Sequence, residues 1–93
     1  MKFRFDYEKN AKLKNERNMG FDEIIQAIED GNLIDIIYNP NREKYPNQKV
    51  ALVRMLEEVY AVPFVIEDDG TFFLKTLFPS RKARKKYLKN QAW

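Results

Sequence analysis

The sequence contains neither cysteine nor histidine among its 93 residues. The absence of cysteine excludes disulfides, a thiol nucleophile and thiolate zinc sites. The absence of histidine removes the commonest general base and most metal-ligand patterns. We therefore expect a chain with no metal site and no cofactor.

Long apolar runs are missing as well. No run approaches the roughly 18 residues that a membrane span requires, and no signal-peptide pattern follows Met1. We therefore expect a cytoplasmic protein with no membrane partner. A chain of 93 residues, 44% of them hydrophobic, has enough for one core and too little for two, so we expect a single domain over 1–93.

The charge, +3 overall, is distributed unevenly along the chain. Residues 1–38 hold six basic and eight acidic side chains, whereas residues 39–93 hold eleven basic and six acidic ones. Residues 80–93 alone carry six Lys or Arg and no acid. This asymmetry indicates an anionic partner at the C-terminal half. A solvated lysine face that serves only solubility remains the alternative.

The local patterns predict an α+β fold, an antiparallel sheet with two N-terminal helices and a C-terminal helix, in the order β-α-α-β-β-β-β-α. The expected elements are a strand at 2–5, a helix from Tyr7 to about Asn18 capped by Asp6, a helix from Phe21 closed by Gly31, a buried strand at 33–38, a loop at 39–48, a hairpin of 49–56 and 59–66, a strand at 71–78 after a turn at 68–70, and a helix from Ser80 to about Gln91. Tyr7, Ala11 and Leu13 are the expected apolar anchors of the first helix. Pro63 cannot donate to a ladder, which predicts an edge or a bulge.

The last helix separates its cations into two groups. At 100° per residue, Lys82, Lys85, Lys86 and Lys89 share one arc, and Ala83, Tyr87 and Leu88 lie opposite, with Arg81 and Arg84 among them. Arg81 is therefore expected on the side toward the sheet and beside the helix N-terminus, where a guanidinium favours a phosphate. A salt bridge to an acid of the first helices is the alternative.

Lys75 interrupts the strand 71–78 on the face expected to hold Phe73 and Leu77. A lone lysine in a strand usually marks the wet face of a half-buried sheet. If Arg81 binds a phosphate nearby, Lys75 would instead contact that substrate phosphate. Both interpretations are open.

Three segments taken in order give a resemblance to a known family. FRFDYEKN near the start, RNMGFDEI after it and PSRKARKKY near the end resemble the F-x-[WF]-D-x-x-K-N, K-H-G-x-x-F-E-E-A and R-I-I-S-A-R-K-A segments of the BrnT family. BrnT proteins are RelE-like toxins of type II toxin–antitoxin modules. The resemblance covers nearly the whole chain.

The resemblance implies a small endoribonuclease that arrests growth by cutting RNA. Its partner would be a ribbon-helix-helix antitoxin (BrnA-like), and operator DNA would be bound only through the antitoxin complex. By position, Arg81 matches the family's S-A-R arginine, and Lys9 and Asn10 match its K-N pair. The family histidine falls at Asn18 or Met19, and the other family arginines fall at Lys75 or Thr76 and at Gln48 or Lys49.

RNA cleavage without metal requires stabilisation of charge on the phosphate oxygens and movement of protons. Arg81, Lys75 and Lys49 are the candidates for charge stabilisation, and Glu43, a lysine or Tyr87 for proton transfer; Tyr87 is equally compatible with the core. RNA-binding candidates are Lys44, Tyr45, Lys82, Arg84 and Lys85, with Lys44 and Tyr45 also placed to transfer protons. A non-catalytic RNA-binding module and a protein-interaction module on the same fold remain alternatives.

Overall fold

The structure, a computed structural model, describes residues 1–88 and forms three helices and a mixed sheet. The elements are β1 (Phe3–Phe5), α1 (Tyr7–Arg17), α2 (Phe21–Glu29), β2 (Leu33–Tyr38), β3 (Lys49–Met55), β4 (Glu58–Ile66), β5 (Phe72–Leu74), β6 (Phe78–Pro79) and α3 (Arg81–Leu88). The α+β prediction is confirmed, with two differences: the predicted strand 71–78 forms two strands, β5 and β6, and the sheet is mixed where an antiparallel one was predicted. Lys89 and the predicted helix end near Gln91 lie outside the described residues.

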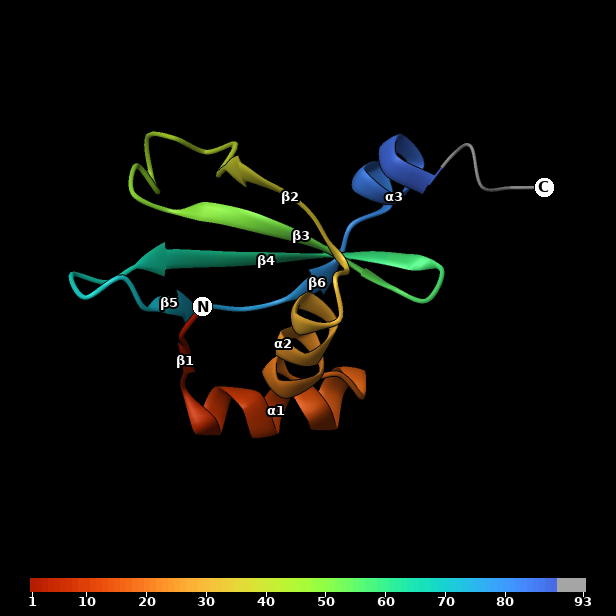
Figure 1. Ribbon diagram of the computed structural model, residues 1–93, viewed down its shortest axis with the longest axis horizontal. Coiled ribbons are helices and arrows are strands. Elements are labelled where there is room, and N and C mark those ends of the chain that lie inside the picture. The colour runs from red at the N-terminus through yellow and green to blue at the C-terminus, as the bar shows by residue number, and fades with distance from the viewer. Residues whose placement is uncertain (89–93) are drawn as a thin grey trace.

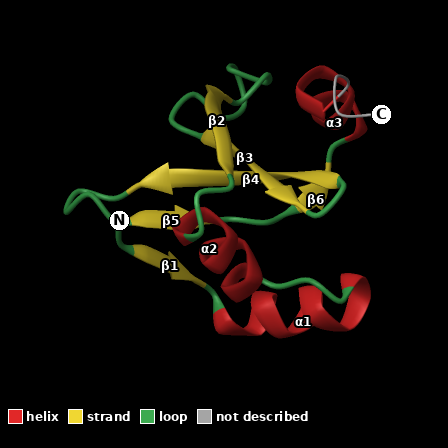
Figure 2. Ribbon diagram, turned by 45° about the vertical axis from the view of Figure 1, so that its right-hand side comes forward, coloured by secondary structure: helices red, strands yellow, loops and turns green. Residues whose placement is uncertain are grey.

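The sheet runs in the order β1-β5-β4-β3-β2, and β6 pairs with β4 beyond the end of β5. All described pairs are antiparallel except β1 with β5, which is parallel, so the N-terminal strand makes the sheet mixed. Figures 1 and 2 show α1 and α2 on one side of this sheet and α3 on the other. The molecule therefore has two helical layers of unequal size.

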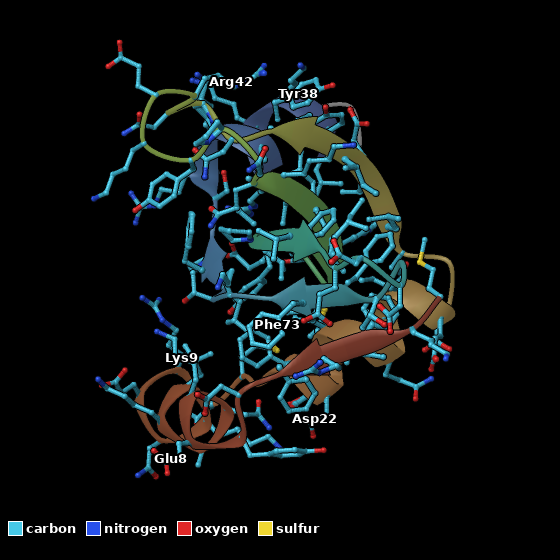
Figure 3. The ribbon with its side chains drawn as sticks, turned by 90° about the vertical axis from the view of Figure 1, so that its left-hand side faces the viewer. Glu8, Lys9, Asp22, Tyr38, Arg42 and Phe73 are labelled. Carbon is cyan, nitrogen blue, oxygen red and sulfur yellow. The ribbon has the colours of Figure 1, made fainter. Side chains whose placement is uncertain are left out.

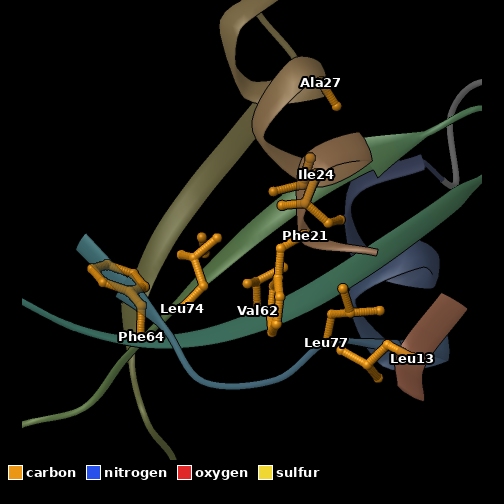
Figure 4. Packing of buried hydrophobic residues seen from close by; sticks show 10 residues of the cluster. Leu13, Phe21, Ile24, Ala27, Val62, Phe64, Leu74 and Leu77 are labelled. Atoms are coloured by element: carbon orange, nitrogen blue, oxygen red, sulfur yellow. The ribbon is translucent and has the colours of Figure 1, made fainter. Parts of the chain in front are cut away.

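The larger core lies between the sheet and the two N-terminal helices (Figure 4). Because side chains alternate along a strand, Ala51 and Val53 of β3 face this core, while Val50 and Leu52 face α3. The buried members of the larger core are Leu13, Phe21, Ile24, Ala27, Ala51, Val53, Val62, Phe64, Leu74 and Leu77. Of the three anchors expected in α1, only Leu13 is buried; Ala11 is exposed, and Tyr7 is 81% exposed, with its ring centroid 5.2 Å from that of Phe5.

The junction between α1 and α2 is closed by polar side chains. Asp6 caps α1 as predicted, since its carboxylate accepts from the N–H groups of Glu8 and Lys9. Asn10 Oδ1 accepts from the Phe21 N–H at 2.7 Å and so caps α2 from the neighbouring helix. A Cβ on Gly20 would lie 2.5 Å from that same oxygen, so only glycine permits this close approach.

Strand β2 is the main correction to the predicted fold. The sequence LIDIIY predicts a buried strand, but β2 forms an edge of the sheet, and residues 35–38 are exposed. Tyr38 is 59% exposed, with Arg42 placed 4.3 Å and Lys49 5.5 Å from its ring centroid. The strand carries apolar residues on both faces because Leu33 packs against the larger core and Ile34 against the smaller cluster on the other face of the sheet. The rest of β2 is exposed.

The predicted strand 71–78 is divided into β5 and β6 by a bulge. Register shows that two residues of β4, Val62 and Pro63, lie opposite three residues, 75–77. The Lys75 N–H donates to the Pro63 carbonyl at 2.8 Å, but Pro63 has no N–H to return the second bond of a regular pair. The pairing therefore stops after Leu74, and one extra residue is accommodated. Pro63 itself lies in a central strand, opposite the bulge that its presence predicted.

Candidate functional site

A cleft of about 730 Å³ opens on the sheet face that α3 covers only in part. Its size lies within the range of about 300–1,000 Å³ that is usual for ligand sites. Figure 1 shows the loop 39–48 and α3 on this side of the sheet, and both contribute to the walls. The cleft is lined by Ile37, Asn39, Pro40, Tyr45, Gln48, Val50, Leu52, Ala61, Pro63, Lys75, Thr76, Phe78, Ser80, Lys82, Ala83, Lys86 and Tyr87.

Three lysines from two elements converge on this cleft. Lys75 reaches it from the bulge, and Lys82 and Lys86 reach it from α3, where a spacing of four residues places them on the same side of the helix. Three lysines on one cleft attract a polyanion, because their fields add while none is paired in a salt bridge within residues 1–88.

The bulge decides which side chains of the segment 75–78 face the cleft. In an uninterrupted strand Leu77 would share a face with Lys75, as the sequence predicted. The extra residue reverses that alternation, so Leu77 is buried in the larger core and Phe78 lines the cleft, 40% exposed. Thr76 also lines the cleft, so three of the four residues 75–78 contribute to it.

The helix α3 is capped at its start and tied to the sheet near its end. Ser80 caps the helix as predicted, because its Oγ accepts from the Ala83 N–H at 3.2 Å. The Tyr87 hydroxyl donates to Asp35 Oδ2 of β2 at 2.9 Å, and its ring packs beside the small core of Val50, Leu52, Val59, Ala61 and Ala83. Tyr87 therefore both lines the cleft and ties α3 to the sheet edge.

The structure places Arg81 and Arg84 differently from the prediction. Both are exposed and neither lines the cleft. The stripe that faces the sheet is centred on Ala83 and Tyr87, and Arg81 lies about 160° around the helix from Ala83 at 100° per residue. The expectation that the arginines face the sheet is therefore wrong. The predicted apolar arc included Leu88, which lies to one side of the buried stripe, and this moved the centre of the arc toward the arginines.

The remaining predicted residues fall into two groups. Tyr45 and Lys82 line the cleft together with Lys75 and Tyr87. Lys49, Lys44 and Lys85 do not: Lys49 alternates with Val50 and so faces the opposite side of the sheet beside Tyr38, while Lys44 and Lys85 are exposed. Figure 3 shows Tyr38 and Arg42 at one end of the molecule and Glu8 and Lys9 at the other. Lys9 therefore lies far from the loop 39–48.

The pKa shifts that the structure produces belong to structural contacts. A hydrogen bond from Lys14 at 2.6 Å is the main cause that lowers the pKa of Asp22, and the same bond raises the pKa of Lys14. The backbone N–H of Thr71 lowers the pKa of Asp69 in the turn after β4. Within residues 1–88 no group of three acidic side chains is placed to hold a metal ion. No helix of that part is long and apolar enough to cross a membrane.

The sequence did not assign Ser80 and Phe78 to a site, and it placed Lys86 only on the lysine face of the last helix and Thr76 and Gln48 only as possible matches to family arginines, although all five line the cleft. For Lys86 the signal was available in its four-residue spacing from Lys82. For Phe78 it was not, because the alternation rule fails at the bulge. Comparisons with protein-family models, with curated proteins and with solved structures found no match.

Proposed function

We propose that this chain is the toxin of a type II toxin–antitoxin module, a BrnT-like, RelE-like endoribonuclease that acts in the cytoplasm without a metal ion. The observation that carries the proposal is the convergence of Lys75, Lys82 and Lys86 on one cleft. The resemblance in sequence supplies the reaction class, and the lysines supply its main electrostatic requirement.

In the proposed reaction the 2′-oxygen of RNA forms a bond to the adjacent phosphorus, and the bond from phosphorus to the 5′-oxygen breaks. Negative charge grows on the non-bridging oxygens, where the lysine ammonium groups stabilise it. One proton leaves the 2′-hydroxyl and one is delivered to the 5′-oxygen. We assign these transfers to Tyr45 and a lysine of the rim, because both line the cleft. Tyr87 positions α3 through Asp35, and Arg81, outside the cleft, contributes attraction at longer range.

The proposed partner is a ribbon-helix-helix antitoxin whose acidic segment covers the lysines of the cleft. Charge cover alone would deny RNA its phosphate contacts, so inhibition requires no conformational change. The complex, not the toxin alone, would bind operator DNA.

The test is growth arrest on expression, together with cleavage of purified RNA in the presence of a chelator. Wild type should arrest growth and cleave, and Lys75→Gln should lose both while its thermal unfolding stays unchanged, because Lys75 is exposed. Lys12→Gln, which removes the same charge from the exposed side of α1, is the matched control and should behave as wild type. If Lys75→Gln remains fully toxic, the proposed site is wrong. RNA binding without cleavage by wild type would instead favour the non-catalytic RNA-binding module.

A further inference from the structure

The cleft combines an apolar floor with a charged rim, which restricts the ligands that fit it. Val50, Leu52, Ala61 and Pro63 form the floor, and each is buried. The three lysines stand around it. An inorganic anion or an acidic side chain would satisfy the lysines and leave the floor in contact with water. A ligand that satisfies both parts carries a flat, weakly polar portion next to a negative charge.

Two aromatic side chains line the cleft and remain partly exposed. Tyr45 comes from the loop 39–48 and is 36% exposed, and Phe78 comes from β6. Leu77, next to Phe78 in the chain, is fully buried in the larger core. The strand end is therefore well packed, and Phe78 is exposed because the bulge turns it to the other face of the sheet. Partly exposed aromatic rings beside cations are typical of surfaces on which unpaired bases stack.

Polar side chains from three segments also line the cleft. The Gln48 side-chain oxygen accepts from Asn39 Nδ2 at 2.8 Å, which directs the Gln48 NH₂ group away from that bond. Thr76 and Ser80 add hydroxyl groups to the lining. The lining therefore includes both hydrogen-bond donors and acceptors, which could contact the edge of a base.

We propose that the cleft receives one unpaired base of single-stranded RNA, with the flanking phosphates on Lys75, Lys82 and Lys86. This inference rests on the proposed function in that RNA is the substrate. It adds that the RNA must be unpaired, because the bases of an A-form duplex stay stacked in the helix and cannot reach the floor. Tyr45 and Phe78 are specificity-determining residues for the unpaired strand.

The experiment measures binding to fluorescent RNA that carries 2′-O-methyl groups throughout, so that attack by the 2′-oxygen is impossible. The same labelled strand is used alone and annealed to its complement, at one salt concentration. Wild type should bind the single strand at least about tenfold more tightly than the duplex. Tyr45→Ala and Phe78→Ala should each weaken single-strand binding by about 5-fold to 100-fold, the usual range for loss of a base–aromatic stack, and leave duplex binding unchanged. Tyr45→Phe should restore the single-strand affinity.

Tyr7→Ala is the matched control, because Tyr7 is an exposed aromatic residue on α1, remote from the cleft. Equal affinity for the single strand and the duplex, or equal losses for both RNAs in Tyr45→Ala and Phe78→Ala, would overturn the inference. Cleavage of unmodified RNA is assayed in parallel. Absence of cleavage with the strand preference intact would overturn the proposed nuclease and leave the base site standing, whereas cleavage without the preference would do the reverse.

Discussion

At the scale of single residues, Asn10 has a structural task that its place in the chain does not reveal. It belongs to the pair Lys9-Asn10 that the BrnT resemblance singles out, yet its amide oxygen caps α2. Lys9 contributes its backbone N–H to the cap of α1. A residue that closes two helices together is constrained by the fold alone, so the K-N pair requires no catalytic role.

Replacement of Asn10 by alanine should lower the free energy of unfolding by about 0.5–2 kcal/mol, the usual cost of a lost helix cap. Asn10→Asp, which keeps an acceptor, should recover most of the loss, and Asn15→Ala on the exposed side of α1 is the control. Denaturant unfolding measures both, and affinity for RNA should not change. A loss of RNA affinity in folded Asn10→Ala would place Asn10 in the site after all.

Tyr87→Phe separates a structural from a chemical role for this phenol. Loss of the hydrogen bond to Asp35 should cost about 0.5–1.5 kcal/mol of stability, because the ring keeps its packing and only the bond is removed. Cleavage measured below the unfolding temperature should persist. Complete loss of cleavage in a folded Tyr87→Phe protein would identify the hydroxyl as a participant in proton transfer.

At the scale of elements, the segment from β5 to β6 shows where sequence patterns suffice and where they fail. The caps at Asp6 and Ser80, the turn at 68–70 and the hairpin of β3 and β4 depend on neighbouring residues, and all were predictable. The sides of the sheet that Leu77 and Phe78 occupy depend on Pro63, 14 and 15 residues earlier in the chain, through strand pairing that local alternation does not contain. The exposure of β2 likewise depends on which strand ends at the edge.

The register of this segment is tested by two alanine substitutions at adjacent positions. Leu77→Ala should cost about 2–5 kcal/mol, since it removes a buried side chain from the larger core. Phe78→Ala should cost about 1 kcal/mol or less, since a good part of that ring already contacts water. The two unfolding free energies are measured side by side. The opposite ranking would show an uninterrupted strand without the bulge.

At the scale of the whole molecule, one face of the sheet carries the larger core and the other carries the cleft. The face with α1 and α2 holds most of the core, with a salt bridge from Lys14 to Asp22 at its surface. The other face has a small core, a thin helical cover and the cleft. Three of the cations of the C-terminal half line this cleft, Lys75 from the bulge and Lys82 and Lys86 from α3, and it is there that we expect an anion to bind.

Salt dependence measures how many cations of the cleft contact RNA phosphates. Three contacts to a single strand predict a slope of log affinity against log salt of about −2, and Lys82→Gln should make the slope shallower by about 0.7. Arg81→Gln removes the same charge outside the cleft and should leave the slope nearly unchanged. Titration of the 2′-O-methyl single strand over several salt concentrations gives all three values. A larger change for Arg81→Gln than for Lys82→Gln would return the phosphate contact to the start of α3.

The bulge opposite Pro63 also bears on the register that the segment 75–78 adopts during folding. Regular pairing would shift the segment by one position, turn Thr76 inward and push Leu77 out into water. Pro63 has no amide hydrogen for the hydrogen bond that regular pairing would require. Leu77 is buried in the larger core only in the bulged register, so burial of its side chain also favours that register. Two independent effects thus favour the bulged register, and the side chain that this register turns toward the cleft is Phe78, one of the two aromatic residues of the proposed base site.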